Sequence, residues 1–454
     1  MPAYDVAIVG GGAVGVATAH ALAASGARVV LLERDRLGRG CSYGNAGLVV
    51  PGHNLPLATP RALRQGLRWL LTGSGPFTVN FRADSALWGW LMRYLLACRT
   101  TVMRRTILAL NSLAAASLER YRALAEQLSL FAFERRGWLY VYTDPASLAA
   151  ALAEATELRI AESSWEAVDA DEARRLCPLL SERIIGGIFY PDEAHLQPYA
   201  AVSSLAERSR SLGAELREGA KVQGLRIEAD RLTAVQVDGE ELAVGWCVLA
   251  AGAESPGMLD RLGRATGSTL LRRIGRRLPV QPARGHSLTW ERPAGAPDLP
   301  LMFGEAHVIA TPMGPSLRMT TGLDLVGFRP GLDPDRVAAI RTAAAAYLPD
   351  LALTGEPEAW YGFRPLTPDS RPIIGPLRRI PNLILATGHG QLGITLAPIT
   401  GELVAAMIHG QRPAPEPAQT SPAPGPSRLA PGAEPTTFAA PLDAGPFSPA
   451  RFGL

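Results

Sequence analysis

The sequence predicts an α/β protein whose first element belongs to a parallel sheet, and three neighbouring features support this prediction. Residues 4–9 are an apolar run with the length of a strand, and residues 28–32 are a second one. Between them lie a Gly-rich turn at 10–15 and an Ala-rich helix at 14–25, which ends at Gly26. Because continuously apolar strands are typical of parallel sheets covered on both faces, we expect a Rossmann-like βαβ unit here.

The turn contains the motif Gly10-x-Gly12-x-x-Gly15, which in this position indicates a dinucleotide site. The first glycine permits the tight turn, and the second lets the backbone approach a pyrophosphate. The third lets the helix pack closely on the strand. The helix N-terminus, at Ala13 and Val14, offers free N–H groups and a partial positive charge to the phosphates.

Glu33, at the end of the second strand, is the expected partner of the ribose. Its carboxylate accepts hydrogen bonds from a ribose diol and repels a 2′-phosphate, which argues against NADP. The alternative interpretation is an ordinary βαβ turn with an exposed glutamate. By itself the motif does not distinguish NAD from FAD.

Composition limits the remaining classes of function. The chain has 454 residues, which is enough for two or three domains of about 150 residues each. Its 47% hydrophobic and 19% charged residues are typical of a globular protein, and a net charge of +3 gives no reason to expect a nucleic-acid partner. No bilayer-spanning run and no signal peptide are expected. Four scattered cysteines without a CxxC pair fit a reducing, cytoplasmic compartment and exclude a cysteine zinc site, so no metal is expected.

Later stretches add strands and helices to this framework. Residues 246–250 are a buried strand, and residues 382–386 are another that runs into a Gly-rich loop and a final helix ending near residue 409. Helices at 62–71 and 85–105 mix tryptophan with arginine. They are either interfacial helices at the inner face of a membrane or a helix pair with one buried face.

Three further motifs give the sequence a resemblance to a known family. They are Cys41–Gly47 (CSYGNAG) followed by Pro51-Gly52, Gly362–Asp369 (GFRPLTPD) followed by Pro372–Gly375 (PIIG), and Thr387–Gly393 (TGHGQLG). Together they resemble the D-amino acid oxidase superfamily of flavoproteins, and most closely the D-amino acid dehydrogenase small-subunit family. The resemblance extends from about residue 4 to residue 410 and implies FAD as the cofactor. Sarcosine-type oxidases carry a cysteine near the position of Arg364 that bonds the flavin, and because this sequence has none there we expect noncovalent FAD.

The resemblance implies that both ends of the chain bind FAD. Near the N-terminus the implied contacts are Gly10, Gly12, Ala13, Val14, Gly15, Glu33, Arg34, Ser42, Asn45, Ala46 and Gly47. In the middle of the chain they are Val222 at the adenine end and Ala251 and Gly252 beside the pyrophosphate. Near the C-terminus they are Gly388, His389, Gly390, Leu392, Gly393, Ile394 and Thr395, which close over the flavin. Reduced flavin accumulates negative charge, which the N-terminus of the helix after Gly393 stabilises through its amides and dipole. The alternative is a Gly-rich turn with a structural role only.

Arg364 is the expected substrate ligand, because the family binds the substrate carboxylate with an arginine in this motif. A guanidinium holds a carboxylate with two parallel hydrogen bonds and so orients the substrate Cα–H toward flavin N5. The alternative is a structural ion pair. His389, His286 and His53 are three candidates for assisting deprotonation of the amine, each weighed against a packing role.

The expected architecture has two discontinuous domains and a tail. The FAD-binding domain comprises residues 1–60, 191–268 and 355–410, and a mixed α+β substrate domain comprises 61–190 and 269–354. Residues 411–454 are crowded with Pro, Ala, Gly and Ser, and their composition predicts a disordered tail.

The function implied by the resemblance is oxidative deamination of a D-amino acid or a cyclic imino acid, such as a D-proline derivative. A hydride would pass from the substrate Cα to flavin N5, and electrons would then pass to a respiratory acceptor such as a quinone or a carrier protein. Two alternatives remain open. One is a glycine- or sarcosine-type amine oxidase that uses oxygen. The other is a non-catalytic flavin-binding subunit or scaffold that contacts partner chains through its Pro-rich tail.

Overall fold

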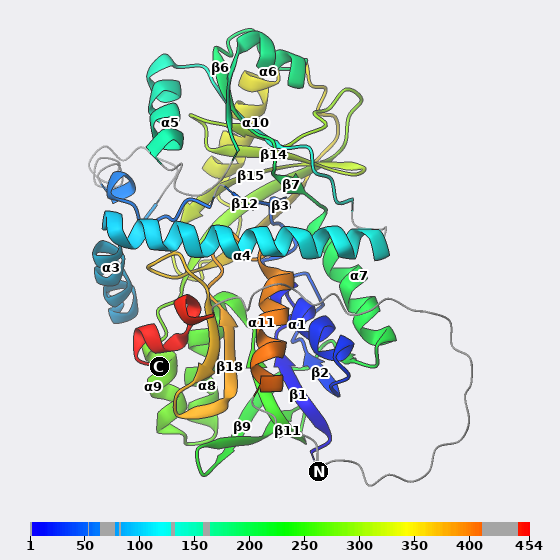
Figure 1. The fold of residues 1–454 in the computed structure, drawn as a ribbon, viewed down its shortest axis with the longest axis vertical. Coiled ribbons are helices and arrows are strands. Elements are labelled where there is room, and N and C mark those ends of the chain that lie inside the picture. The colour runs from blue at the N-terminus through cyan, green and yellow to red at the C-terminus, as the bar shows by residue number, and fades with distance from the viewer. Residues whose placement is uncertain are drawn as a thin grey trace.

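The structure is a computed structural model that describes residues 2–52, 54–63, 78–80, 83–128, 132–157, 164–410 and 444–454. Two eight-stranded sheets organise these residues, one at each end of the long axis (Figure 1). In the first sheet the strand order is β17-β18-β11-β1-β2-β8, and the hairpin β9–β10 extends from β11. Its strands are β1 (Tyr4–Val9), β2 (Val29–Leu32), β8 (Glu215–Arg217), β9 (Val222–Glu228), β10 (Arg231–Val237), β11 (Glu240–Leu249), β17 (Ile373–Leu377) and β18 (Ile380–Thr387).

The first sheet is covered on both faces, as its apolar strands predict. Strand β1 runs parallel to β2 and β11, and β11 runs parallel to β18. Val6 and Ile8 of β1 pack in the apolar cluster that contains α1 (Ala13–Ala24), α7 (Pro198–Ser211) and α11 (Ala397–Gly410). Ala7 and Val9 point to the opposite cluster, which contains α8 (Ser255–Ala265) and α9 (Thr269–Arg277). The predicted βαβ unit is therefore present at its expected place.

The second sheet is mostly antiparallel and has the order β16-β12-β15-β14-β13-β4-β6-β5. Its strands are β4 (Trp138–Tyr142), β5 (Glu166–Asp169), β6 (Gly186–Tyr190), β12 (Gln281–Glu291), β13 (Leu301–Phe303), β14 (Val308–Met313), β15 (Ser316–Asp324) and β16 (Glu358–Leu366). Helices α5 (Pro145–Glu157), α6 (Ala170–Leu176) and α10 (Pro334–Tyr347) belong to this end of the molecule, and β3 (Leu48–Val49) pairs with β7 (Ala194–His195) between the two ends.

Strand β16 lies in this second sheet, although the expected boundary at residue 355 assigned it to the FAD-binding domain. Helix α9 likewise packs under the first sheet although it begins after the expected boundary at residue 268.

One predicted helix boundary is wrong. The sequence predicted a helix over 85–105, whereas the structure has α3 (Ser85–Ala97) and a separate α4 (Thr100–Gln127). The chain turns at Arg99, whose backbone is extended (φ −103°, ψ 139°). Most of the other predicted helix, 62–71, lies outside the described residues.

Helix α4 crosses the molecule between the two sheets (Figure 1), and its side chains bond to α11, to the segment before α11 and to Asn54. The Tyr121 hydroxyl donates to the Ile394 carbonyl (2.6 Å), and Arg120 forms an ion pair with Glu402 (2.9 Å). Near the middle of α4, the buried amides of Asn54 and Asn111 are hydrogen-bonded (3.0 Å). These contacts fix the position of the segment before α11 relative to α4.

The end of the chain differs from the prediction of a disordered tail. Residues 411–443 of that tail lie outside the described residues, but residues 444–454 form two short 3₁₀ helices, η2 (Gly445–Phe447) and η3 (Pro449–Phe452). They lie against β17, the outermost strand of the first sheet (Figure 1, red). Phe447 and Leu454 are buried there.

Candidate active site

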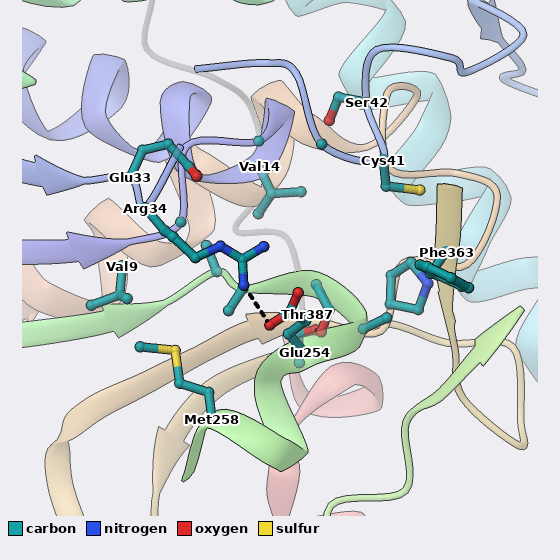
Figure 2. Close-up of a pocket in the computed structure, with 18 of the residues that line it drawn as sticks. Val9, Val14, Glu33, Arg34, Cys41, Ser42, Glu254, Met258, Phe363 and Thr387 are labelled. Carbon is teal, nitrogen blue, oxygen red and sulfur yellow. Dashed lines mark hydrogen bonds and ion pairs between the residues drawn. The ribbon is translucent and has the colours of Figure 1, made fainter. Parts of the chain in front are cut away.

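A cavity of about 670 Å³ opens at the carboxyl ends of the parallel strands of the first sheet. The residues that follow β1, β2 and β11, namely Gly10, Glu33 and Ala250, all line it. Strand β16 of the second sheet closes the other side with Trp360 and Phe363 (Figure 2). This is the place where open α/β sheets bind ligands.

The Gly-rich turn forms a backbone cradle at one end of the cavity. Gly10 has φ +110°, and a Cβ there would lie 2.6 Å from the Ala250 carbonyl oxygen, so this position requires glycine. A Cβ at Gly15 would lie 1.9 Å from the Gly10 oxygen, which shows how closely α1 packs on the turn. Gly12 instead faces the cavity. A Cβ added there would lie 3.4 Å from the Ser42 hydroxyl oxygen, which is ordinary contact distance. The N–H of Ala13 at the start of α1 donates to that hydroxyl (3.0 Å).

Two side chains after β2 are held in place at the same end. The Glu33 carboxylate accepts hydrogen bonds from the N–H groups of Gly11 (2.6 Å) and Asp35 (2.8 Å), so it is fixed at the cavity wall. Arg34 forms an ion pair with Glu254 (2.9 Å), which joins the end of β2 to the segment after β11 (Figure 2). The hydrogen bond to Glu254 is the main reason that the pKa of Arg34 is raised.

The opposite end of the cavity contains His389, which is 3% exposed. Its Nε2 lies 3.0 Å from the Thr400 hydroxyl, and that hydroxyl donates to the Leu396 carbonyl (2.8 Å). Because the hydroxyl has one proton, it accepts from His389 Nε2–H, and the inferred tautomer leaves Nδ1 as an acceptor. Burial lowers the pKa of His389 to about 3, so this side chain is neutral at neutral pH.

Arg364 lies beside the cavity, between the lining residues Phe363 and Pro365. Its guanidinium passes over Gly285, where a Cβ would lie 2.0 Å from Nη1, and Nη1 donates to the Gly322 carbonyl (2.7 Å). Among the described residues no carboxylate lies within ion-pair distance of it, because Asp324, the nearby acid, pairs with Arg336. Burial lowers the pKa of Arg364, while Cys41 and Asp324 oppose that shift.

The structure places a second candidate histidine, His286, away from the cavity. His286 is buried on β12, and its Nε2 accepts the N–H of Asp333 at the start of α10 (3.2 Å). It alternates with Gly285, so its side chain projects from the opposite face of the sheet to the one on which Arg364 lies. Burial lowers the pKa of His286 to about 4. His53 lies outside the described residues.

Most of the other predicted FAD ligands line the cavity. These are Gly10, Gly12, Ala13, Val14, Glu33, Arg34, Ser42, Asn45, Val222, Ala251, Gly252, His389, Gly390, Gly393 and Ile394. Gly15, Ala46, Gly47, Gly388, Leu392 and Thr395 do not line it but lie directly behind or beside residues that do. The Thr395 hydroxyl, for example, donates to the Leu48 carbonyl (3.0 Å) and so ties the start of α11 to β3.

Several lining residues were not predicted from the sequence, among them Cys41, Glu254, Met258, Phe328, Trp360 and Phe363. Trp360 lies against Gly44 and Gly362, since a Cβ at either glycine would fall within 2.0 Å of its ring. No motif in the sequence indicated this contact, because Gly44 and Trp360 are far apart along the chain. Arg318 was also missed. This buried guanidinium donates to the carbonyls of Tyr43 (2.5 Å) and Asn45 (3.0 Å) and so holds the cavity segment 41–47 against the second sheet.

Comparisons with known proteins agree with this geometry. The family described as FAD dependent oxidoreductase (DAO) matches residues 5–407. The D-amino acid dehydrogenase of Dechloromonas aromatica is 33% identical over 423 residues, which cover 90% of this chain and 98% of that protein. The D-amino acid dehydrogenase 2 of Pseudomonas aeruginosa is 35% identical over 421 residues, with 90% and 96% covered. Among solved structures, a glycine oxidase from Bacillus cereus has a similar fold, with a TM-score of 0.69, 22% identity and coverage of 90% and 96%.

The residues present fit FAD. A diphosphate suits the open backbone at Gly12 and the amides at the start of α1, and a ribose suits the fixed Glu33 carboxylate. The lining of the same cavity also includes His389 and residues of β16. The family match spans most of the chain and both ends of this cavity. The chain therefore belongs to the DAO family of FAD-dependent oxidoreductases.

Proposed function

We propose that this protein oxidises a D-amino acid or a cyclic imino acid at the carbon that carries the nitrogen. The observation that carries the proposal is Arg364, a guanidinium beside the FAD cavity that has the Gly322 carbonyl as its one acceptor among the described residues. An arginine with unused donors in such a position suits the α-carboxylate of an amino acid. The names of the D-amino acid dehydrogenases that resemble this chain over nearly their whole length support the same substrate class.

The bound FAD supplies the acceptor for a hydride from the substrate Cα. The protein's own residues orient the substrate and control water. Arg364 fixes the carboxylate, while Trp360, Phe363 and Phe328 line the neighbouring wall with apolar rings. His389 is a neutral imidazole at neutral pH, so it adds no positive charge to the cavity.

We propose further that the electrons leave to a quinone or a carrier protein at the surface of a membrane. No described helix is long and apolar enough to cross a bilayer. Helix α3, however, exposes Trp88 (49%), Met92 (59%) and Leu96 (56%), which recur along one side of it at helical spacing. Four exposed arginines lie close to them in sequence, namely Arg93 on α3, Arg99 at the turn, and Arg104 and Arg105 on α4. An apolar stripe with arginines beside it suits the surface of an anionic membrane.

The substrate proposal is tested by anaerobic mixing of the FAD-loaded protein with a panel of D-amino acids, L-amino acids, glycine, sarcosine and the two enantiomers of proline. Loss of flavin absorbance with D-amino or imino acids is the expected result. Bleaching with glycine or sarcosine alone, and rapid peroxide formation in air, would instead support the oxygen-using oxidase. No bleaching by any of these amines would support a non-catalytic flavin protein.

The membrane proposal is tested by sedimentation with vesicles of phosphatidylglycerol and of phosphatidylcholine. We expect binding to the anionic vesicles that weakens with salt and is lost in a Trp88→Ser, Met92→Ser, Leu96→Ser variant. Leu332→Ser, which removes an exposed leucine elsewhere (40% exposed), is the matched control. Equal binding of the triple variant would contradict a role for α3.

A further inference from the structure

The last eleven residues cover an edge that would otherwise be exposed. Strand β17 is the outermost strand of the first sheet, and η2 and η3 lie against it. Phe447, 2% exposed, enters the apolar cluster on one face of the sheet, and Leu454, 7% exposed, enters the cluster on the other face. The segment thus reaches around β17 from one face to the other, and its Pro449 ring touches the strand at Gly375.

Arg451 holds this segment through every nitrogen of its guanidinium. Nε and Nη2 donate to the two oxygens of Asp369 (2.9 and 3.4 Å), and Nη2 also donates to the carbonyls of Arg371 (2.8 Å) and Pro372 (3.0 Å). Nη1 donates to the carbonyl of Phe447 (2.7 Å) and of its neighbour Ser448 (3.1 Å). The contact is therefore both a buried ion pair and a cap for two backbone carbonyls of the loop before β17.

Asp369 is 6% exposed and depends on this arginine. Burial alone would raise the pKa of its carboxyl, but the charges of Arg451 and Arg371 and the hydrogen bonds outweigh burial and lower it. Arg371 pairs with the same carboxylate (2.8 Å). Removing Arg451 would leave the buried Asp369 carboxylate with Arg371 as its one ion-pair partner, and the Pro372 carbonyl would lose the hydrogen bond from Arg451.

The loop that carries Asp369 also packs on the Gly-rich turn whose residues line the cofactor cavity. It leads from β16, which carries Arg364, to β17, and its Thr367 hydroxyl donates to the Arg371 carbonyl (2.8 Å). A Cβ at Gly388 would lie 2.5 Å from Thr367 Cγ2, so the loop packs on the Gly-rich turn next to His389. Leu366 and His389 form a β-bridge. A movement of the loop would therefore move the wall of the cavity.

We propose that residues 444–454 are an intramolecular peptide ligand, and that their binding to β17 and the loop 367–372 holds the cavity wall in its FAD-binding position. The site accepts an apolar peptide with one arginine, and its occupant is this chain's own C-terminus. The family match ends at residue 407, so this ligand is an addition to the part that the chain shares with the family. The proposal requires only that FAD binds and does not depend on the identity of the substrate.

The first experiment compares full-length variants by their dissociation constant for FAD. We expect Arg451→Ala to raise it about tenfold and Arg451→Lys to raise it less, since lysine keeps the charge but not the fork of donors. Arg379→Ala is the matched control, because Arg379 is exposed on the turn after β17. Unchanged FAD affinity in folded Arg451→Ala would overturn the proposal.

A second experiment keeps the native sequence of the segment and remains decisive if Arg451→Ala does not fold. A protease site is inserted between residues 411 and 443, the FAD-loaded protein is cut, and the fragments are separated by gel filtration under native conditions. The C-terminal fragment is expected to stay bound and to dissociate after dilution together with loss of FAD. Free release of the fragment with FAD retained would contradict the proposal. A full-length protein that is a dimer and becomes a monomer in Arg451→Ala would show that the ligand comes from a second copy, which would also overturn it.

Discussion

Two partly buried arginines, Arg364 and Arg451, lie near the loop 367–372, and their surroundings are opposite. Arg451, near the loop after β16, uses all its nitrogens on protein acceptors, including a carboxylate. Arg364, within β16, has one side-chain hydrogen bond within the described part of the chain, to a carbonyl. Burying a cation without a matching anion is unfavourable, so such a site is retained where a ligand supplies the anion. The comparison separates an arginine that stabilises the fold from one that is kept for a substrate.

The largest effect that this comparison predicts is on turnover in Arg364→Ala. Losing two charge-assisted hydrogen bonds to a carboxylate is expected to lower the rate of flavin reduction per unit substrate concentration by about 10³-fold, or about 4 kcal/mol. Stopped-flow absorbance under anaerobic conditions measures it, with Arg364→Lys as the partial replacement. The thermal unfolding temperature is expected to change little. A large drop in that temperature with normal kinetics would reverse the roles of the two arginines.

Arg451→Ala should show the reverse pattern. It leaves the Asp369 carboxylate buried with Arg371 alone, and we expect the free energy of unfolding to fall by about 3 kcal/mol. Chemical denaturation monitored by tryptophan fluorescence measures this loss. Arg379→Ala serves again as the control, and a loss below about 0.5 kcal/mol in Arg451→Ala would mean that the ion pair contributes nothing net.

A smaller effect concerns two of the buried histidines, His389 in the cavity and His286 away from it. Their pKa values are lowered by burial, to about 3 for His389 and about 4 for His286. Between pH 6.5 and 4 the unfolded chain therefore binds protons that the folded chain does not, and stability falls as the pH falls through this range. His286→Asn should remove about 2 kcal/mol of that decrease without altering substrate kinetics. Denaturant midpoints at pH 7 and pH 4.5 provide the test, and an unchanged slope would show that His286 titrates normally.

The smallest expected effect distinguishes the glycines of the cradle. Gly12→Ala adds a methyl group that faces the cavity, so FAD affinity should fall about tenfold while the apoprotein keeps its stability. Gly10→Ala, at φ +110° and against the Ala250 carbonyl, should instead destabilise the apoprotein itself. Titration with FAD and thermal unfolding of the apoproteins measure both quantities. Equal destabilisation by both substitutions would show that Gly12 is also required for packing.

The sequence predicted those parts of the molecule that are encoded over short distances. The βαβ unit, Glu33 and the loop at Gly390–Gly393 follow from local periodicity and motif spacing, and they line the cavity as expected. The break at Arg99 was missed, because Ser85–Arg105 is apolar at helical spacing on both sides of it and the break is visible only in the backbone. Trp360 and Glu254 were missed because their places in the wall depend on the pairing of distant strands.

The end of the chain was misjudged for a different reason. Residues 411–454 contain too few apolar residues to form a core of their own. The prediction treated them as one segment and so missed a short stretch that packs on a core formed by other residues. The segment is too short to fold alone, but it docks on the first sheet through Phe447, Arg451 and Leu454. His286 was considered for its chemistry, but alternation along β12 places it on the far face of the sheet from Arg364.

The burial of Leu454 has a practical consequence for handling the protein. An affinity tag fused after this residue would have to emerge from an apolar cluster. Any displacement of Leu454 by the tag would disturb the packing on β17, the outermost strand of the first sheet. With its cover displaced, β17 would present unpaired peptide groups to neighbouring molecules, which is the usual starting point for intermolecular strand pairing and precipitation. Purification handles therefore belong at the N-terminus, which Figure 1 shows apart from the C-terminus.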